Sequence, residues 1–296
     1  MEALGDFRPS TAYTRELGDE VRDVRTRSGL SLTKLAEGLG WSKGKLSKME
    51  NGRRGSDVVD LIRLVGYCHG DDSSLDRILT IAREGETGYI IRSHVDGVPD
   101  GLRALIASER KASTITTFEP NVVPGMLQTR EYARALMTTS GDPAVEASVT
   151  TRMERQELLR GSEPPSCSFF IHEAALHGKV GGDQVMADQM LQLALWSAWG
   201  HVEIRLVPFA VGARQSLLHS LRYMSFAFSE PVVYAETQAL SVLSERPEVV
   251  AAHKRALEDI DELALDAQES RSEFARWADR YERLRGQDDP EGPPLA

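Results

Sequence analysis

The chain has 296 residues, of which 41% are hydrophobic and 27% are charged, so it is long enough for two globular domains. It contains no run of about 18 apolar residues, and its N-terminus lacks the basic-then-apolar order of a secretory signal, so we expect a cytoplasmic protein without a membrane partner. The formal net charge of −10 argues against a general polyanion-binding protein.

The acidic excess lies entirely in the C-terminal part of the chain. Residues 1–92 carry 15 basic and 15 acidic side chains, whereas residues 93–296 carry 20 and 30. Within residues 22–54 there are nine basic side chains against three acidic ones. A basic island on an acidic chain fits one small surface that faces phosphate.

Residues 1–13 have no apolar periodicity, and we expect them to be a mobile arm. Residues 14–86 predict five short helices with glycines at their joints, because apolar residues recur at helical spacing. Short helices are unstable alone, so these must share one core. The expected buried positions are Leu17, Val21 and Val24; Leu32, Leu35, Ala36 and Leu39; Leu46 and Met49; Leu61, Ile62, Val65 and Cys68; and Leu75, Ile78, Leu79 and Ala82.

Residues 87–112 are interpreted as a linker, and residues 113–285 as an α/β domain. The expected strands are 115–120, 167–173, 201–209, 221–228 and 231–237. Helices are expected over 130–137, 145–161 and 183–200, and residues 247–285 are strongly helical. Residues 286–296 are expected to be a disordered tail.

Features of catalytic or metal-binding proteins are absent from the sequence. Cys68 and Cys167 stand in apolar contexts far apart, so we expect them to be buried and reduced. His172 and His177 are five residues apart, whereas a helical zinc motif needs histidines four apart. Without a phosphate-binding glycine loop, a CxxC pair or a nucleophile elbow, we expect no enzyme, no metal and no cofactor.

The segment SLTKLAEGLGWSKGKLSKMENGRR, residues 31–54, carries the functional argument. Ser31 and Ser42 are placed to cap two consecutive helices, and Gly40 suits a left-handed turn between them. A tight helix-turn-helix lets one helix brace the DNA backbone while the next enters the major groove.

A helical wheel divides the second of these helices into a buried and an exposed face. Leu46 and Met49 mark the buried side, and the residues that point away from it, expected to read bases, are Lys43, Gly44, Ser47 and Lys48. The residues expected to contact phosphate are Ser42, Lys45, Arg53 and Arg54. Periodicity alone fits equally a small helical domain with a solvated basic face.

The pattern LxxLAxxLGWSxxxLSxMENGRR is similar to the helix-turn-helix of lambda-repressor-like (xenobiotic-response-element) regulators. The resemblance implies binding to a double-stranded DNA operator by a homodimer. In it, Lys43, Gly44, Ser47 and Lys48 match the base-reading positions, and Ser42 and Arg53 the phosphate-contacting ones. The sequence Arg54-Gly55-Ser56 departs from the proline that relatives often have there, which leaves the role of Arg54 open.

The later segments FEPNVVPGMLQTREYA, IHEAALHGKVGG and VEIRLVPF resemble a domain of unknown function in actinobacterial regulators. Those regulators are described as antitoxin-like and are usually encoded beside a very short protein. The resemblance implies a transcriptional regulator, associated with the nucleoid when bound to DNA, whose C-terminal domain responds to that short protein or to a ligand. The alternative is an enzyme or small-molecule sensor domain fused to a DNA-binding head.

The expected fold class is thus α plus α/β. A five-helix head of the lambda-repressor type precedes a mixed α/β regulatory domain that ends in long helices.

Overall fold

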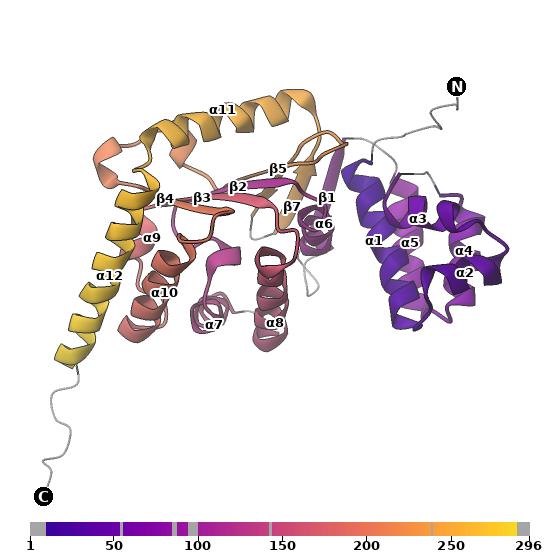
Figure 1. The fold of residues 1–296 in the computed structure, drawn as a ribbon, viewed down its shortest axis with the longest axis horizontal. Helices are drawn as coiled ribbons and strands as arrows, with labels where there is room; N and C mark the ends of the chain where they lie inside the picture. Colours follow the sequence, from indigo (N-terminus) through magenta and orange to yellow (C-terminus); the bar gives the residue numbers. More distant parts are fainter. Residues whose placement is uncertain are drawn as a thin grey trace, which may run out of the picture. The chain divides into compact units, whose positions relative to one another are not determined.

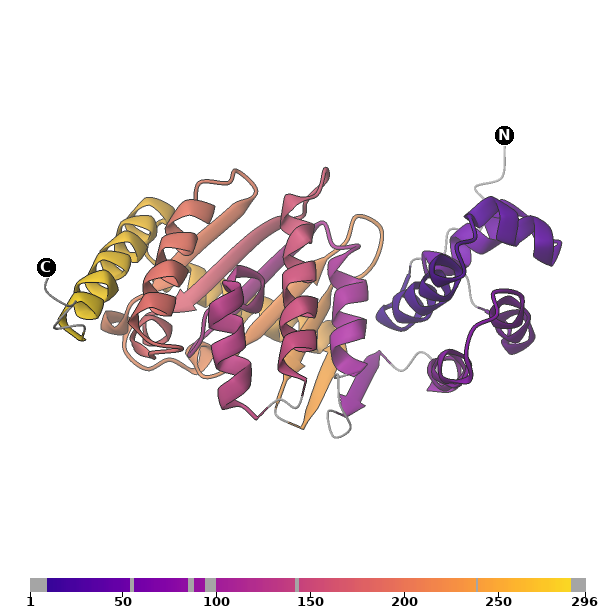
Figure 2. The ribbon, with the colours of Figure 1, turned by 90° about the horizontal axis from the view of Figure 1, so that it is seen from below.

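The computed structural model describes residues 10–53, 56–84, 88–93, 100–141, 144–237 and 239–288 (Figures 1 and 2). The chain forms two compact units. The first consists of residues 1–112 and 224–250, and the second of residues 113–223 and 251–296.

The first unit begins with a bundle of helices joined by short turns. Thr11 caps the first helix in a reciprocal capping box with Thr14, and Ser31, Ser42 and Asp57 each cap one of the next three through a side-chain oxygen. Gly40 ends the second helix in the left-handed conformation, as predicted, with φ of 69°. The helices are α1 (Ala12–Arg27), α2 (Leu32–Leu39), α3 (Lys43–Glu50), α4 (Val58–Tyr67) and α5 (Asp72–Glu84).

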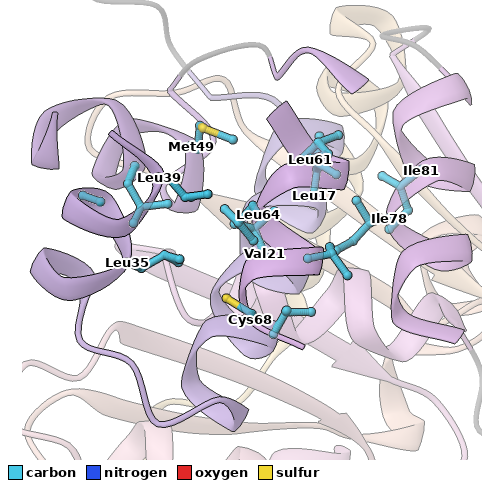
Figure 3. Close-up of a cluster of buried hydrophobic side chains, with 14 residues drawn as sticks. Leu17, Val21, Leu35, Leu39, Met49, Leu61, Leu64, Cys68, Ile78 and Ile81 are labelled. Carbon is cyan, nitrogen blue, oxygen red and sulfur yellow. The ribbon is translucent and has the colours of Figure 1, made fainter. Parts of the chain in front are cut away.

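One hydrophobic core joins these helices (Figure 3). The buried residues of α4 are Leu61, Leu64 and Val65, with Cys68 just beyond its end. The prediction of Ile62 in the core was wrong: this side chain is 44% exposed, and Leu64 is buried in its place. Leu61, Leu64, Val65 and Cys68 have the spacing i, i+3, i+4, i+7 of one helical face, from which Ile62 is rotated away.

Strands and one further helix complete the first unit. Strand β7 (Leu240–Ser244) pairs antiparallel with β1 (Tyr89–Ser93) on one side and with β6 (Val232–Glu236) on the other. Helix α6 (Asp100–Glu109) packs against β1, β7 and α1. The sequence predicts a linker over residues 87–112, whereas the structure has strand β1 and helix α6 in this region. The residues that pair with β1 lie 147 to 155 positions further along the chain, so a local sequence pattern cannot predict this strand.

Buried ion pairs connect α1 to this second part of the unit. The Glu16 carboxylate lies 2.6 Å from the Arg92 guanidinium on β1, and the Arg15 guanidinium lies 3.0 Å from Glu245, just after β7. Arg15 and Glu16 are almost completely buried. A buried charge is stable only when it is paired, so both side chains require their partners.

The second unit contains a sheet with strand order β5-β2-β3-β4. Strands β2 (Thr114–Glu119), β3 (Ser166–His172) and β4 (Val202–Val207) run parallel, and Ile115, Cys167 and Val202 are aligned across them. The run of buried residues in β3 is typical of a parallel strand covered on both faces. Strand β5 (Leu221–Ser225) continues into the first unit from Met224.

Helices cover both faces of this sheet (Figures 1 and 2). Helices α7 (Arg130–Thr139), α8 (Val145–Gln156) and α10 (Asp183–Trp196) lie on one face, and α11 (Pro247–Leu263) lies on the other. Leu257 and Ile260 of α11 pack against Phe118, Phe170 and Val207. Helix α12 (Ala267–Asp288) packs along α10, and the short helix α9 (Ala174–His177) follows β3. Single 3-10 turns are at Gly125–Leu127, Glu157–Arg160, Phe209–Val211 and Gln215–Leu217.

The predicted fold class, a helical head followed by a mixed sheet with long C-terminal helices, is confirmed. Each expected strand and helix of residues 113–285 has a counterpart, although the region 247–285 is divided into two helices at residues 264–266. Cys68 and Cys167 are buried and free, as expected. The predicted arm and tail lie largely outside the described residues.

Gly18 permits a close main-chain contact between α1 and α3. A Cβ atom at this position would lie 2.6 Å from the Met49 carbonyl oxygen and 2.8 Å from that of Glu50. These are main-chain atoms, which cannot rotate away as a side chain does. The helix packing therefore depends on glycine at this position.

We expect Gly18→Ala to lower the free energy of unfolding of the full chain by about 1–2 kcal/mol, measured by urea denaturation. Overpacking costs about 1–3 kcal/mol, more than alanine gains through helix propensity. Gly44→Ala is the matched control, because only the Ser42 Oγ lies within 4.0 Å of the added Cβ. It should be neutral or stabilising by up to about 1 kcal/mol. A stabilising Gly18→Ala would show that α1 and α3 are not in close contact.

Candidate nucleic-acid interface

Helix α3 is short and is positioned mainly by its ends and by two apolar anchors. Leu46 and Met49 are buried in the core of the head. At its start, the Ser42 Oγ accepts a hydrogen bond from the Lys45 amide (3.1 Å), which confirms the predicted cap. The first main-chain N–H groups of the helix therefore lie beside an exposed serine, where a phosphate is favoured.

The face of α3 opposite these anchors is open to solvent. Lys43, Gly44 and Lys48 are exposed, and Ser47 is half-buried. Within the described part of the chain, the Lys43 and Lys48 amines have no hydrogen bond or ion pair with another residue. The residues predicted to read bases therefore share one face, and both lysines can donate to a ligand.

Lys45, predicted to contact phosphate, has partners within the protein. Its amine lies 2.5 Å from the Asp60 carboxylate on α4 and 4.0 Å from the centre of the Trp41 ring. These contacts join α3 to α4 and reduce the charge that Lys45 presents to a polyanion. Its role as a phosphate ligand stays a prediction.

The loop after α3 contains the two arginines that were predicted to contact phosphate. Arg53 is exposed, and its guanidinium lies 5.9 Å from the centre of the Phe228 ring. Gly52 before it has φ of 65°, and a Cβ there would lie 2.6 Å from the Thr14 carbonyl oxygen. Glycine at this position therefore allows the chain to turn close to the main chain of α1 just before Arg53. Arg54 lies outside the described residues.

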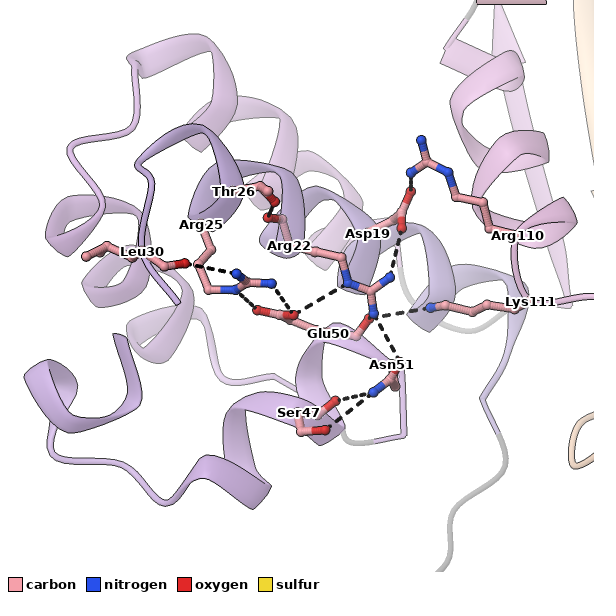
Figure 4. A network of polar contacts seen from close by, with 10 residues as sticks. All are labelled: Asp19, Arg22, Arg25, Thr26, Leu30, Ser47, Glu50, Asn51, Arg110 and Lys111. Carbon is pink, nitrogen blue, oxygen red and sulfur yellow. Dashed lines mark hydrogen bonds and ion pairs between the residues drawn. The ribbon is translucent and has the colours of Figure 1, made fainter. Parts of the chain in front are cut away.

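The C-terminal end of α3 is held by a polar network that the sequence analysis did not predict (Figure 4). Glu50 is 2% exposed, and its carboxylate accepts hydrogen bonds from Arg25 at 2.5 and 3.0 Å and from Arg22 at 3.5 Å. The hydrogen bond to Glu50 is also the main cause of a raised pKa of Arg25. This buried carboxylate fixes α3 to α1.

Asn51 extends the network to the exposed face of α3. Its side-chain oxygen accepts from Arg22 (3.0 Å), and its amide donates to the carbonyl of Ser47 (2.8 Å) and to the Ser47 Oγ (3.4 Å). The sequence contains the members of this network, Arg22 and Arg25 in α1 and Glu50 and Asn51 at the end of the helix-turn-helix pattern, but nothing in their spacing pairs them.

The His172 and His177 side chains, weighed in the sequence analysis as metal ligands, belong to the second unit. His172 Nδ1 accepts from the Ala174 amide (3.2 Å), and His177 Nε2 lies 3.6 Å from Glu173. Burial lowers the pKa of His172. Among the described residues, no group of three or more His, Cys, Asp or Glu side chains is placed to hold one metal ion.

No helix in the described part of the chain is both long and apolar enough to span a membrane.

Two family models match the chain. A helix-turn-helix domain matches residues 16–78, which cover most of α1 to α5, and a domain of unknown function, DUF5753, matches residues 102–276. None of the curated proteins compared with the chain matches it. The helix-turn-helix is a DNA-binding motif and suggests a DNA-binding regulator. Since the second model covers more than half of the chain, the protein belongs to the DUF5753 family, and it carries an N-terminal helix-turn-helix domain.

Proposed function

We propose that the protein is a sequence-specific, DNA-binding transcriptional regulator whose helix α3 reads the major groove of double-stranded DNA. The observation that carries this proposal is the outward face of α3. It presents Lys43, Gly44 and Lys48 to solvent in a segment matched by a helix-turn-helix model. Lysine donates to the O6 and N7 atoms of guanine, and glycine allows the helix backbone to approach the bases.

The charge distribution supports a small DNA interface. The basic excess is confined to residues 22–54, and three of its exposed members, Lys43, Lys48 and Arg53, lie on α3 and in the loop after it. One small head buries little surface on DNA, so we further propose a homodimer that binds two related half-sites. Such a protein acts in the cytoplasm, on the nucleoid.

Regulation is the proposed role of the acidic part of the chain. Residues 93–296 carry ten more acidic than basic side chains, and their field repels phosphate. We therefore propose that this part of the chain acts mainly through dimerisation, sensing or both. The resemblance to regulators encoded beside a short protein supports such a protein as the partner.

We expect Lys43→Ala and Lys48→Ala to weaken binding to an operator selected from a random duplex library more than binding to random DNA. Each base contact contributes about 1–3 kcal/mol of discrimination. Fluorescence anisotropy with operator variants measures this directly. Equal losses of affinity for operator and random DNA would show that both lysines contact only phosphate.

Arg53→Ala provides the contrast, because Arg53 lies in the loop and not on the exposed face of α3. It should weaken operator and random DNA alike, and it should lower the slope of log K against log salt concentration by about one. An unchanged slope would show that Arg53 does not contact phosphate.

A short protein partner should co-purify with the tagged protein from its native host and shift its operator affinity. Typical coupling between two sites is about 1–3 kcal/mol, which corresponds to a change of about 5- to 150-fold. Operator titration with and without the recovered protein measures it. If nothing smaller co-purifies and the full chain alone is a DNA-binding dimer, the acidic part is a dimerisation scaffold.

A further inference from the structure

The C-terminal end of α3 is capped by a side chain from outside the helix-turn-helix. The Glu50 main-chain carbonyl accepts hydrogen bonds from the Arg22 guanidinium on α1 (3.0 Å) and from the Lys111 amine (3.4 Å). Lys111 follows the end of α6 and belongs to the segment matched by DUF5753. Figure 4 shows its amine directed at the main-chain carbonyl of Glu50.

This position is connected to the DNA-facing side of α3 by short contacts. Arg22 donates to Asn51, and Asn51 donates to Ser47, one of the residues predicted to read bases. Next to Lys111, Arg110 pairs with Asp19 at 3.0 Å, and Asp19 in turn lies 3.6 Å from Arg22. The turn after α6 therefore supplies one donor to the Glu50 carbonyl, Lys111, and through Arg110 and Asp19 it helps to position the other, Arg22.

Electrostatics explains why a cation is favoured at this point. The last carbonyl groups of a helix carry partial negative charge, and a nearby Lys or Arg stabilises the helix end. Helix α3 has only eight residues, so its own stability is low and its ends matter.

The surroundings of Lys111 make its charge sensitive to pH. Burial is the main cause that lowers the pKa of Lys111 to about 8, assisted by Arg22 and Arg15 on α1 and Arg53 in the loop after α3; Asp19 on α1 opposes them. The amine is therefore charged below about pH 8 and becomes neutral above it.

We propose that Lys111 is a positioning residue for DNA reading: it caps the C-terminal end of α3 and so fixes the Asn51–Ser47 end of the exposed face. The proposal rests on the proposed function for its DNA consequence, but the cap itself exists without DNA. It gives the region of unknown function a direct contact with the helix that reads DNA.

The test uses full-length protein with Lys111→Met, Lys111→Arg or Arg103→Met. Arg103→Met is the matched control: it removes one charge from α6, the helix that precedes Lys111, and Arg103 pairs with Glu20 on α1 at 3.5 Å, not with α3. Glu20 keeps its closer partner, Arg77, at 2.6 Å. Thermal unfolding confirms that each variant is folded. The readouts are amide hydrogen exchange of residues 43–53 without DNA, and affinity for operator and random duplex at pH 7 and pH 9.

Lys111→Met should speed exchange of residues 43–53 about two- to fivefold while α2 is unchanged, because a cation at a helix end contributes about this much. It should lower the ratio of operator to random-duplex affinity by a similar factor, whereas Arg103→Met leaves the ratio unchanged. Lys111→Arg should restore both. Operator affinity of the unmodified protein should fall from pH 7 to pH 9 more than that of Lys111→Arg, which keeps its charge.

Unchanged exchange in Lys111→Met, or the same affinity ratio in Lys111→Met and Arg103→Met, would overturn the proposal. Faster exchange in a protein that does not prefer operator over random DNA has a different meaning. It would support the cap and contradict the proposed function.

Discussion

The pairing of charged side chains buried along α1 determines how the first unit is assembled. Arg15, Glu16 and Glu20 are almost inaccessible to solvent, so each needs an opposite charge. Arg77 on α5 supplies one inside the bundle, and Arg92 and Glu245 supply others from β1 and the end of β7. Loss of one partner from a buried ion pair costs about 3–5 kcal/mol. Because α1 has such partners both in the bundle and beside the strands, it holds these two parts of the unit together.

The same helix positions the proposed reading element. Gly18 allows the backbones of α1 and α3 to approach closely, and Arg22 and Arg25 pair with the buried Glu50. Two apolar anchors are too few to fix the orientation of an eight-residue helix, and these polar contacts fix it further. Specificity in DNA binding requires that base-contacting side chains be held in fixed geometry, which a buried carboxylate between two arginines provides.

Local sequence patterns were sufficient to predict the helices of the bundle and the exposed face of α3. Serine caps, Gly40 and the spacing of Leu46 and Met49 act within a few residues, so they can be read without the fold. The prediction for Ile62 was wrong because the segment Val58-Val59-Asp60-Leu61-Ile62 has apolar side chains on two faces of the helix. The pairing of β1 with β7 and the Lys111 contact depend on residues 61 to 155 positions apart, and a single sequence contains no signal for such pairings.

The most direct measurement of whether α3 reads sequence is selection of duplex DNA from a random library by the purified full-length protein. Reading by two copies of α3 predicts enrichment of one motif whose half-sites are related by two-fold symmetry and lie about one helical turn apart. Enrichment of no sequence, with binding that depends only on salt concentration, would contradict sequence reading by α3.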